Sequence, residues 1–443
     1  MKVAVWSPLP PAPSGASAGT AALLPALARH HEIVAVVEEP AAVDRSAVPG
    51  IPVVAAGSAG TADLDLYQIA GAPEHVFVYR AALARPGVAV LHEWVLHDLV
   101  WHHAIDRGDV SLYLREMRRS HGEAGSFVGR QVARGLGGTM LPVLFASNDR
   151  LVEHSLAVAT FTREAGARLD RRHPHVLRRH LPRPVALPES PRPSRAEARR
   201  VLGLPGDALI VTAPEAGSSP ESLEAVVRAA GRLRREFRSL RLVLAGEVDP
   251  GQGWEARAAE AGLGDAMVLA GRVSSTDLVL HLLAADVVSA LRFPSRGEMP
   301  SVLVQAVGVG RPALVTAGTA PAEEMPEGVV VPIDPGPRQD EDLFLRLRQL
   351  LGDEGLRGTI GERARAYALA HLGLEATAAG LAAFLEEVNG RRAELLGRIQ
   401  ADPFEDGSLG GYLADEILLA ARDLGLAGWP LGLEALLAPL VRT

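Results

Sequence analysis

Short, almost uninterrupted apolar runs recur along the chain with helical stretches between them, and this alternation constrains the fold more than any other feature. In the first part of the chain the runs are KVAVW (2–6), EIVAVV (32–37), LDLYQIA (64–70) and GVAVLHEW (87–94). A strand that is apolar at successive positions is buried on both faces, which is typical of a parallel sheet covered by helices on each side. We therefore predict a doubly wound α/β unit over residues 1–180.

A second series of the same kind follows a segment rich in Pro and Arg. Its apolar runs are ALIVTAP, LRLVLAGE, AMVLAGRV, DVVSALRF, ALVTAG and GVVVPID. The predicted division is a first domain at 1–180, a linker at 181–195, a second domain at 196–365 and a helical segment at 366–443. A chain of 443 residues is too long for one core, so two domains are expected. Two open parallel sheets that face each other bind ligands at the carboxyl ends of their strands.

Composition excludes several classes of function. The net charge of −8 and an aromatic content of 4% argue against a nucleic-acid-binding protein. Cysteine is absent, which excludes disulfides, a thiolate nucleophile and a cysteine metal site. No apolar stretch approaches the roughly 18 residues of a membrane span, and the first apolar run is too short for a signal peptide, so we expect a cytoplasmic protein. Lys2 is the only lysine, and any other cation in a site must be arginine or histidine.

The end of the chain is strongly apolar, LADEILLAARDLGLAGWPLGLEALLAPLV. Two interpretations stay open. Either the tail forms a pair of helices packed on the body, or it forms a surface for a partner, through which the chain makes a homo- or hetero-oligomer.

Several segments, in order, resemble the retaining nucleotide-sugar glycosyltransferases of the family-four type, and within them a bacterial subgroup. The segments are SPLPPAPSGASAGTAALLPAL, LYQIAGAPEHVFVY, PGVAVLHEWVLHDL and AADVVSALRFPSRGE. The resemblance covers roughly residues 1–385. It implies the GT-B fold, in which two facing Rossmann-like domains carry C-terminal helices.

The same resemblance implies a reaction. A nucleoside diphosphate sugar binds mainly to the second domain and an acceptor to the first, and the sugar is transferred with retained configuration. The family needs no metal and no further cofactor, so donors aimed at the developing charge have to stabilise the diphosphate leaving group.

On the first domain, the resemblance assigns four residues. Gly15 matches a glycine whose backbone approaches the donor phosphates, where a Cβ would intrude. His92 matches the catalytic histidine, at the carboxyl end of its strand. Glu93 stands where the subgroup often has Asp, and Glu93 and His97 are assigned to the acceptor side. For each of these, a plain turn, cap or interface role is the alternative.

On the second domain, Glu298 matches the acid that binds donor-sugar hydroxyls, and we expect it to be catalytic together with His92. The backbone N–H groups at the start of the next helix are expected to face the diphosphate, with Ser301 as the helix cap. The remaining donor-binding candidates are Arg272, Arg292, Arg296, Met299, Ser301, Val302 and Gln305, the last of which replaces a glutamate of the wider family.

One departure separates two functional interpretations. The family usually has a basic pair after the first strand of the second domain, whereas Glu221 and Ser222 stand in those places here. A carboxylate about 4 Å from a phosphate charge costs on the order of 4 kcal/mol at an effective dielectric near 20. The chain is therefore predicted to be an active glycosyltransferase, or alternatively a catalytically inactive GT-B homologue that acts as a binding or scaffolding partner.

Overall fold

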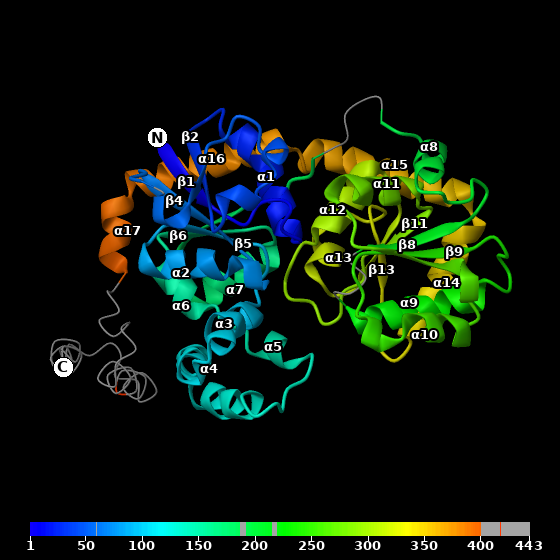
Figure 1. The fold of residues 1–443 in the computed structure, drawn as a ribbon, viewed down its shortest axis with the longest axis horizontal. Coiled ribbons are helices and arrows are strands. Elements are labelled where there is room, and N and C mark those ends of the chain that lie inside the picture. The colour runs from blue at the N-terminus through cyan, green and yellow to red at the C-terminus, as the bar shows by residue number, and fades with distance from the viewer. Residues whose placement is uncertain (59, 187–191, 215–218, 400–416, 418–443) are drawn as a thin grey trace.

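The computed structural model describes residues 1–58, 60–186, 192–214, 219–399 and 417. Figure 1 shows two domains side by side, each a sheet with helices on both faces. The first sheet has seven parallel strands in the order β3-β2-β1-β4-β5-β6-β7. They are β1 (Lys2–Trp6), β2 (Glu32–Val37), β3 (Val53–Ala55), β4 (Leu64–Ile69), β5 (Val88–Leu91), β6 (Ala157–Thr160) and β7 (Leu177–His180).

Both faces of the first sheet are buried, as the uninterrupted apolar runs predict. In β1, Val3 and Val5 belong to one core cluster, and Ala4 and Trp6 belong to a second cluster on the opposite face. The helices packed around the sheet are α1 (Gly15–Leu27), α2 (Val76–Ala84), α3 (His97–Ala104), α4 (Val110–Val132), α6 (Asp149–His154) and α7 (Arg163–Arg172). The short α5 (Leu141–Leu144) has no buried residue and lies beside α3, away from the strands (Figure 1).

The second sheet has six parallel strands in the order β10-β9-β8-β11-β12-β13. They are β8 (Ile210–Pro214), β9 (Arg241–Ala245), β10 (Met267–Gly271), β11 (Val287–Ser289), β12 (Ala313–Thr316) and β13 (Val331–Ile333). Its helices are α8 (Arg195–Val201), α9 (Pro220–Leu233), α10 (Trp254–Glu260), α11 (Ser275–Ala284), α12 (Ser301–Val309), α13 (Ala320–Glu324) and α14 (Gln339–Gly352). The predicted fold of two Rossmann-like domains is confirmed.

The C-terminal helices return the chain to the first domain. Helix α15 (Glu354–His371) packs on the second domain against α12, and it runs unbroken through residue 366, where the sequence suggested a boundary. Helix α16 (Leu374–Gly390) then packs on α1 and completes the first core with Phe384 and Leu385. A short helix, α17 (Arg392–Arg398), follows. The predicted helices of the apolar tail lie outside the described residues, apart from residue 417.

Two chain crossings join the domains, and they lie next to each other. The backbone N–H of Val185 donates to the carbonyl of Leu372 at 2.9 Å, and the hydroxyl of Thr377 donates to the carbonyl of Pro182 at 3.1 Å. The outgoing and returning segments therefore form one paired connection.

Candidate functional site

The two sheets meet at their carboxyl edges through the loop that links β11 to α12. The carbonyl of Arg296 in this loop accepts hydrogen bonds from the backbone N–H groups of Trp94 and Val95, at 2.9 and 3.1 Å. The hydroxyl of Thr162 donates to the carbonyl of Gly297 at 3.2 Å. Trp94 follows β5 and Thr162 follows β6, so the loop docks on the ends of two neighbouring strands of the first domain.

Gly297 fits this contact because it has no side chain. Its φ of +76° lies in the left-handed region, which disfavours any residue with a Cβ. A Cβ built there would lie 2.8 Å from Cβ of Trp94. The glycine therefore allows the loop to approach the first domain at backbone distance.

Four charged side chains gather at this junction. The guanidinium of Arg296 lies 2.6 Å from the carboxylate of Asp98 on α3. Burial tends to lower the pKa of Arg296, but the carboxylates of Asp98, Glu93 and Glu298 outweigh that effect and raise it. Arg296 is thus held at the junction, with its ion pair to Asp98 of the first domain.

Glu93 is the most perturbed acid of the group. Its Oε1 accepts a hydrogen bond from the backbone N–H of Gly71 at 2.6 Å. Burial raises the pKa of Glu93 to about 7, the charge of Glu298 adds to the rise, and Arg296 opposes it. Near neutral pH this carboxyl can therefore either donate or accept a proton.

Glu298 is oriented by its own loop. Its Oε2 accepts the backbone N–H of Arg296 at 2.6 Å, and the hydroxyl of Ser295 lies 3.4 Å from the same oxygen. The residue stands in the loop that links β11 to α12, three positions before the first residue of α12.

His92 lies at the carboxyl end of β5 in a chain of hydrogen bonds. Its Nε2 lies 2.7 Å from Oε1 of Gln68, and the backbone carbonyl of Gln68 accepts from Nδ1 of His75 at 2.8 Å. Since Oε1 of Gln68 can only accept, the proton of His92 is on Nε2 and its Nδ1 is an acceptor. Burial lowers the pKa of His92 well below its ordinary value and that of His75 to about 4, so both rings are neutral.

A small cavity adjoins the ring of His92. Its volume is about 10 Å³, which is close to the room that one water needs. The Nδ1 atom of His92 and the hydroxyl of Thr20 are both buried without a hydrogen-bond partner in the described part of the chain. The cavity is mostly apolar, and Thr20, Gln68, His92 and Arg183 are the polar residues of its lining.

The sequence analysis missed Arg183 at this cavity, because its segment was assigned to a linker. The guanidinium of Arg183 donates to the carbonyl of Gly15 at 3.2 Å and lies 5.5 Å from the ring centroid of Phe161. Gly15 is the first residue of α1, which is capped by the hydroxyl of Ser14. The scarcity of lysine could have pointed to Arg183, because almost every cation in this sequence is an arginine and a cation at the site had to be an arginine or a histidine.

His97 is built into the interior of the first domain. Its Nδ1 donates to the carbonyl of Phe145 at 2.8 Å, and its Nε2 lies 3.0 Å from the hydroxyl of Tyr113. Both ring nitrogens are thus used by protein groups, and the structure does not bring His97 together with the other candidates.

Helix α12 starts with its backbone N–H groups at the junction. Its N-cap is Pro300 and no side chain caps it, so the predicted cap at Ser301 is wrong by one position: Ser301 is the first helical residue. The side chains of Met299 and Val302 are buried in the core, so these residues offer only their backbone N–H groups. The Oε1 of Gln305 is buried without a partner among the described residues.

The other predicted phosphate ligands are more dispersed. Arg292 is anchored at its backbone, where its N–H donates to the hydroxyl of Thr316 at 3.0 Å. Arg272 is exposed after β10, at the far edge of the sheet.

Glu221 and Ser222 begin α9 differently from the basic pair that they replace. Glu221 is exposed in the first helical turn, where an acid complements the helix dipole. Water solvates this charge, so its repulsion of a phosphate 4 Å away falls to about 1 kcal/mol. Ser222 is buried with its hydroxyl 2.8 Å from that of Ser219. Residues 215–218 of the same loop lie outside the described residues.

No group of three or more His, Asp or Glu side chains in the described residues is arranged to hold a metal ion. None of the described helices is both long and apolar enough to cross a membrane.

Two parallel Rossmann-like sheets that face each other across this junction define the GT-B architecture. Residues 194–367, less than half of the chain, match the family described as Glycosyl transferases group 1. The comparison with curated protein sequences finds no match.

Solved glycosyltransferase structures share the fold. HepE from Anabaena in complex with UDP and glucose is 15% identical, with a TM-score of 0.57 over 90% of this chain and 99% of that one. Sucrose-phosphate synthase from Thermosynechococcus elongatus is 16% identical, with a TM-score of 0.60 over 88% and 99%. WaaG, a glycosyltransferase involved in lipopolysaccharide biosynthesis, is 16% identical, with a TM-score of 0.58 over 86% and 99%.

Proposed function

We propose that this chain is a metal-independent, retaining glycosyltransferase of the family-four type, which transfers a sugar from a nucleoside diphosphate sugar to an acceptor. The observation that carries the proposal is the placement of Glu298. Its loop ends at the N-terminus of α12, at the carboxyl edge of the second sheet, and docks on the first domain through Gly297 and Trp94.

Different groups at the junction can bind different parts of the donor. The backbone N–H groups at the start of α12 offer unpaired donors and a positive helix end to a diphosphate. The carboxylate of Glu298 can accept hydrogen bonds from sugar hydroxyls. The Nδ1 acceptor of neutral His92 can hold a further hydroxyl, and Gly15 begins the helix that follows β1 at the same carboxyl edge of the sheet.

Glu93 can take part in removing the proton of the acceptor hydroxyl, a step in which the donor-binding residues have no role. An acceptor hydroxyl loses its proton during transfer, and a carboxyl whose pKa is about 7 is suited to take part in that exchange. Glu93 would thus position the acceptor on the first domain, with Arg296 and Asp98 holding the adjoining loop.

The comparisons support the donor class. A group 1 match over residues 194–367 covers the second domain, and HepE has been crystallised with UDP-glucose. The cytoplasm is the location that we expect for an enzyme using such a donor.

A second function is favoured by one observation. Arg296 pairs with Asp98, and the places of the family's basic pair are taken by Glu221 and Ser222. A catalytically inactive homologue that binds or scaffolds a partner would keep the fold and need no cations at the diphosphate.

Thermal unfolding with a panel of UDP-, GDP- and dTDP-sugars separates the two functions. A ligand that binds only the native state at about 100 times its Kd stabilises it by about 2.7 kcal/mol. We expect at least one donor to raise the Tm at millimolar concentration, and the double substitution Glu298→Ala with Arg292→Ala to abolish the shift.

A matched control is Glu327→Ala, which removes an exposed acid on the loop before β13 and should leave the shift intact. If no nucleotide sugar in the panel stabilises the protein, the inactive alternative replaces the proposal. Release of free nucleoside diphosphate from the stabilising donor, in the presence of candidate acceptors, then measures turnover directly.

A further inference from the structure

A second cavity lies at the opposite edge of the second sheet, where β11 and β12 begin. Asp286 directly precedes β11, and Arg311 and Pro312 precede β12. The cavity has a volume of about 300 Å³, within the range of small-molecule sites. It is lined by Arg192, Arg195, Asp286, Gly310, Arg311, Pro312, Glu354, Arg357, Gly358, Gly361, Glu362 and Arg365.

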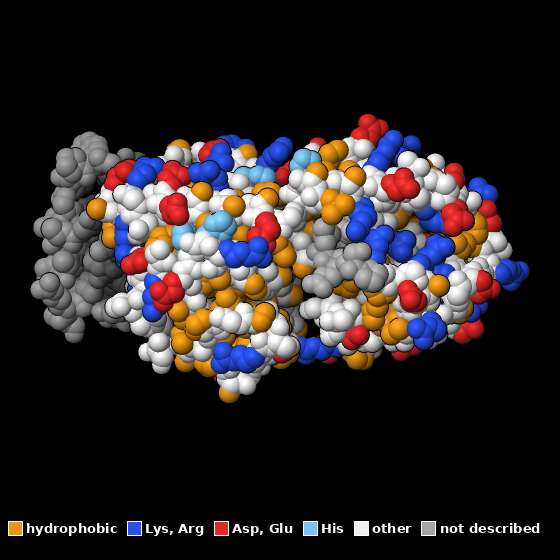
Figure 2. Space-filling model, turned by 90° about the horizontal axis from the view of Figure 1, so that it is seen from above, with side chains coloured by type: hydrophobic (Ala, Val, Ile, Leu, Met, Phe, Trp, Pro, Cys, Tyr) orange, Lys and Arg blue, Asp and Glu red, His pale blue; other side chains and the backbone are white. Residues whose placement is uncertain are grey.

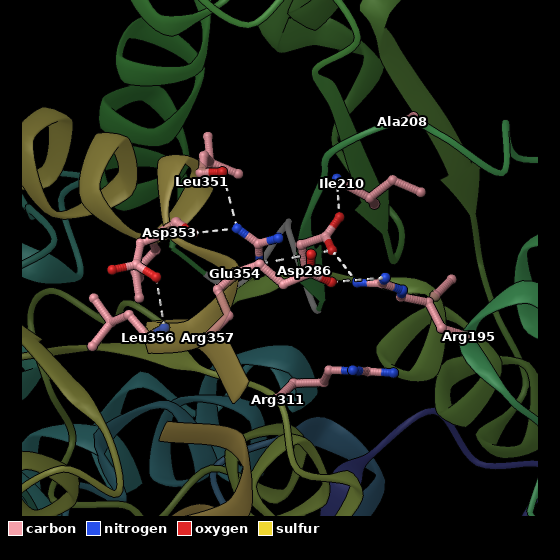
Figure 3. A network of polar contacts seen from close by, with 12 residues as sticks. Arg195, Ala208, Ile210, Asp286, Arg311, Leu351, Asp353, Glu354, Leu356 and Arg357 are labelled. Carbon is pink, nitrogen blue, oxygen red and sulfur yellow. Dashed lines mark hydrogen bonds and ion pairs between the residues drawn. The ribbon is translucent and has the colours of Figure 1, made fainter. Parts of the chain in front are cut away.

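The lining contains more positive than negative charge. Five arginines face three acids, Asp286, Glu354 and Glu362. Asp286 is already neutralised, because Arg195 lies 2.7 Å from its Oδ1 and the buried Arg199 lies 2.8 Å from its Oδ2. Figure 3 shows this network, with Arg195 and Arg357 on either side of Asp286.

Three of the arginines have no acid partner within the described ranges. Arg192, Arg311 and Arg365 each donate to a backbone carbonyl, those of Val309, Leu283 and Gly308. Capping the carbonyls at the end of α12 accounts for two of these contacts, but a neutral carbonyl does not cancel a cation.

Arg311 shows the effect of this excess charge most clearly. In Figure 3 its side chain extends below the ion pair of Asp286 with Arg195, and no dashed line joins it to them. Its Nε is buried without a partner in the described part of the chain. Burial lowers the pKa of Arg311 to about 10, and the positive charge of Arg195 contributes. The pKa of Arg192 is also lowered, by burial and then by Arg365.

The packing of α15 leaves the cavity open. At Gly361 the two helices α12 and α15 are in close contact, because a Cβ there would lie 2.4 Å from the carbonyl oxygen of Gly310. At Gly358, on the same helix, a Cβ would meet nothing within 4 Å. Glycine inside a helix is about 1 kcal/mol less favourable than alanine, and packing does not require it at Gly358.

We propose that this cavity binds a small molecule that carries two or more phosphate-type negative charges, at a site separate from the candidate donor site. Guanidinium groups bind phosphate oxygens through paired, charge-assisted hydrogen bonds. A ligand of this kind would supply the missing counter-charge to Arg192, Arg311 and Arg365. In Figure 2 several basic side chains, all of them arginines because Lys2 is the only lysine, lie close together on the second domain with acids among them. Such a local excess of positive charge would attract an anion.

The test uses inorganic pyrophosphate, titrated calorimetrically into the full chain at low ionic strength. The background is the variant Glu298→Ala with Arg292→Ala, which removes one of the candidate phosphate-binding cations of the donor site. We expect pyrophosphate to bind to this background variant.

Two further changes should each weaken pyrophosphate binding at least tenfold. The first is Gly358→Met, which fills the cavity without changing its charge, and the second is Arg192→Gln combined with Arg365→Gln. The control is Arg228→Gln, an exposed arginine of α9, which should change the affinity less than twofold.

A second measurement does not depend on the folding of any variant. Pyrophosphate should slow the modification of Arg192, Arg311 and Arg365 by phenylglyoxal at least fivefold, read by peptide mass spectrometry, and leave Arg228 unaffected. Absence of binding at 10 mM pyrophosphate, unchanged affinity in both cavity variants, or equal labelling with and without pyrophosphate would each overturn the proposal.

Discussion

The raised pKa of Glu93 makes the stability of the protein depend on pH in a direction opposite to that of most carboxylates. Its ordinary value is 4.5, and in the folded chain it is about 7. The folded state therefore holds the proton more tightly than the unfolded chain. The resulting stability is fully present below pH 4.5 and is lost as pH rises through 7. The difference between 4.5 and 7 corresponds to at most about 3.4 kcal/mol. Screening by solvent at this partly exposed carboxyl reduces the contribution to about 2–3 kcal/mol.

The variant Glu93→Gln isolates this contribution. The amide oxygen can still accept the backbone N–H of Gly71, and Arg296 keeps its ion pair with Asp98. We expect the variant to match the wild type near pH 4.5 and to exceed its free energy of unfolding by about 2–3 kcal/mol at pH 8.

Urea unfolding at pH 4.5, 6, 7 and 8 measures the difference, with Glu39→Gln as an exposed control that should leave the pH profile unchanged. If Glu93→Gln is less stable than the wild type at pH 8, the folded state stabilises the ionised carboxylate of Glu93, through Arg296, and does not penalise it. The reasoning from burial would then be refuted.

Three further changes test other parts of the structure. Gly297→Ala places a Cβ 2.8 Å from that of Trp94 at a positive φ, so it should cost about 1–3 kcal/mol by urea unfolding and weaken donor binding. Arg199→Met removes a buried partner of Asp286 and should cost about 3–5 kcal/mol; a loss below 1 kcal/mol would show that Arg195 compensates. Phe384→Ala should cost about 3–5 kcal/mol, and fluorescence of Trp6 and its neighbours should report the loss in the first domain, because α16 packs there.

Apolar patterning predicted the two sheets because most of their strands are buried on both faces. It was weaker at the sheet edges. The strand β7 reads LRRH and was not among the predicted strands, since an edge strand needs few apolar residues. On the other sheet, β10 was expected to be fully buried, yet Leu269 is 38% exposed because β10 is also an edge.

The site was less predictable because its contacts join residues far apart in the sequence. Position at a strand end places His92 and Glu298 near the junction, but the pairing of Arg296 with Asp98 cannot be read from either segment alone. His97 has an unremarkable sequence environment, and only the fold brings it against Phe145 and Tyr113. The packing of α16 on the first domain could not be predicted either, because an apolar helix face does not specify which domain it covers.

The return of α16 to the first domain has a consequence for synthesis on the ribosome. The strands of that domain end with β7 at His180, but its hydrophobic core also needs Phe384 and Val388. At typical translation rates of about 5–20 residues per second, roughly 10–40 s pass between the two. During that interval the nascent first half exposes the surface of α1 that α16 will cover, while the second half is still being made. A helix translated about 200 residues later thus closes the domain that was made first.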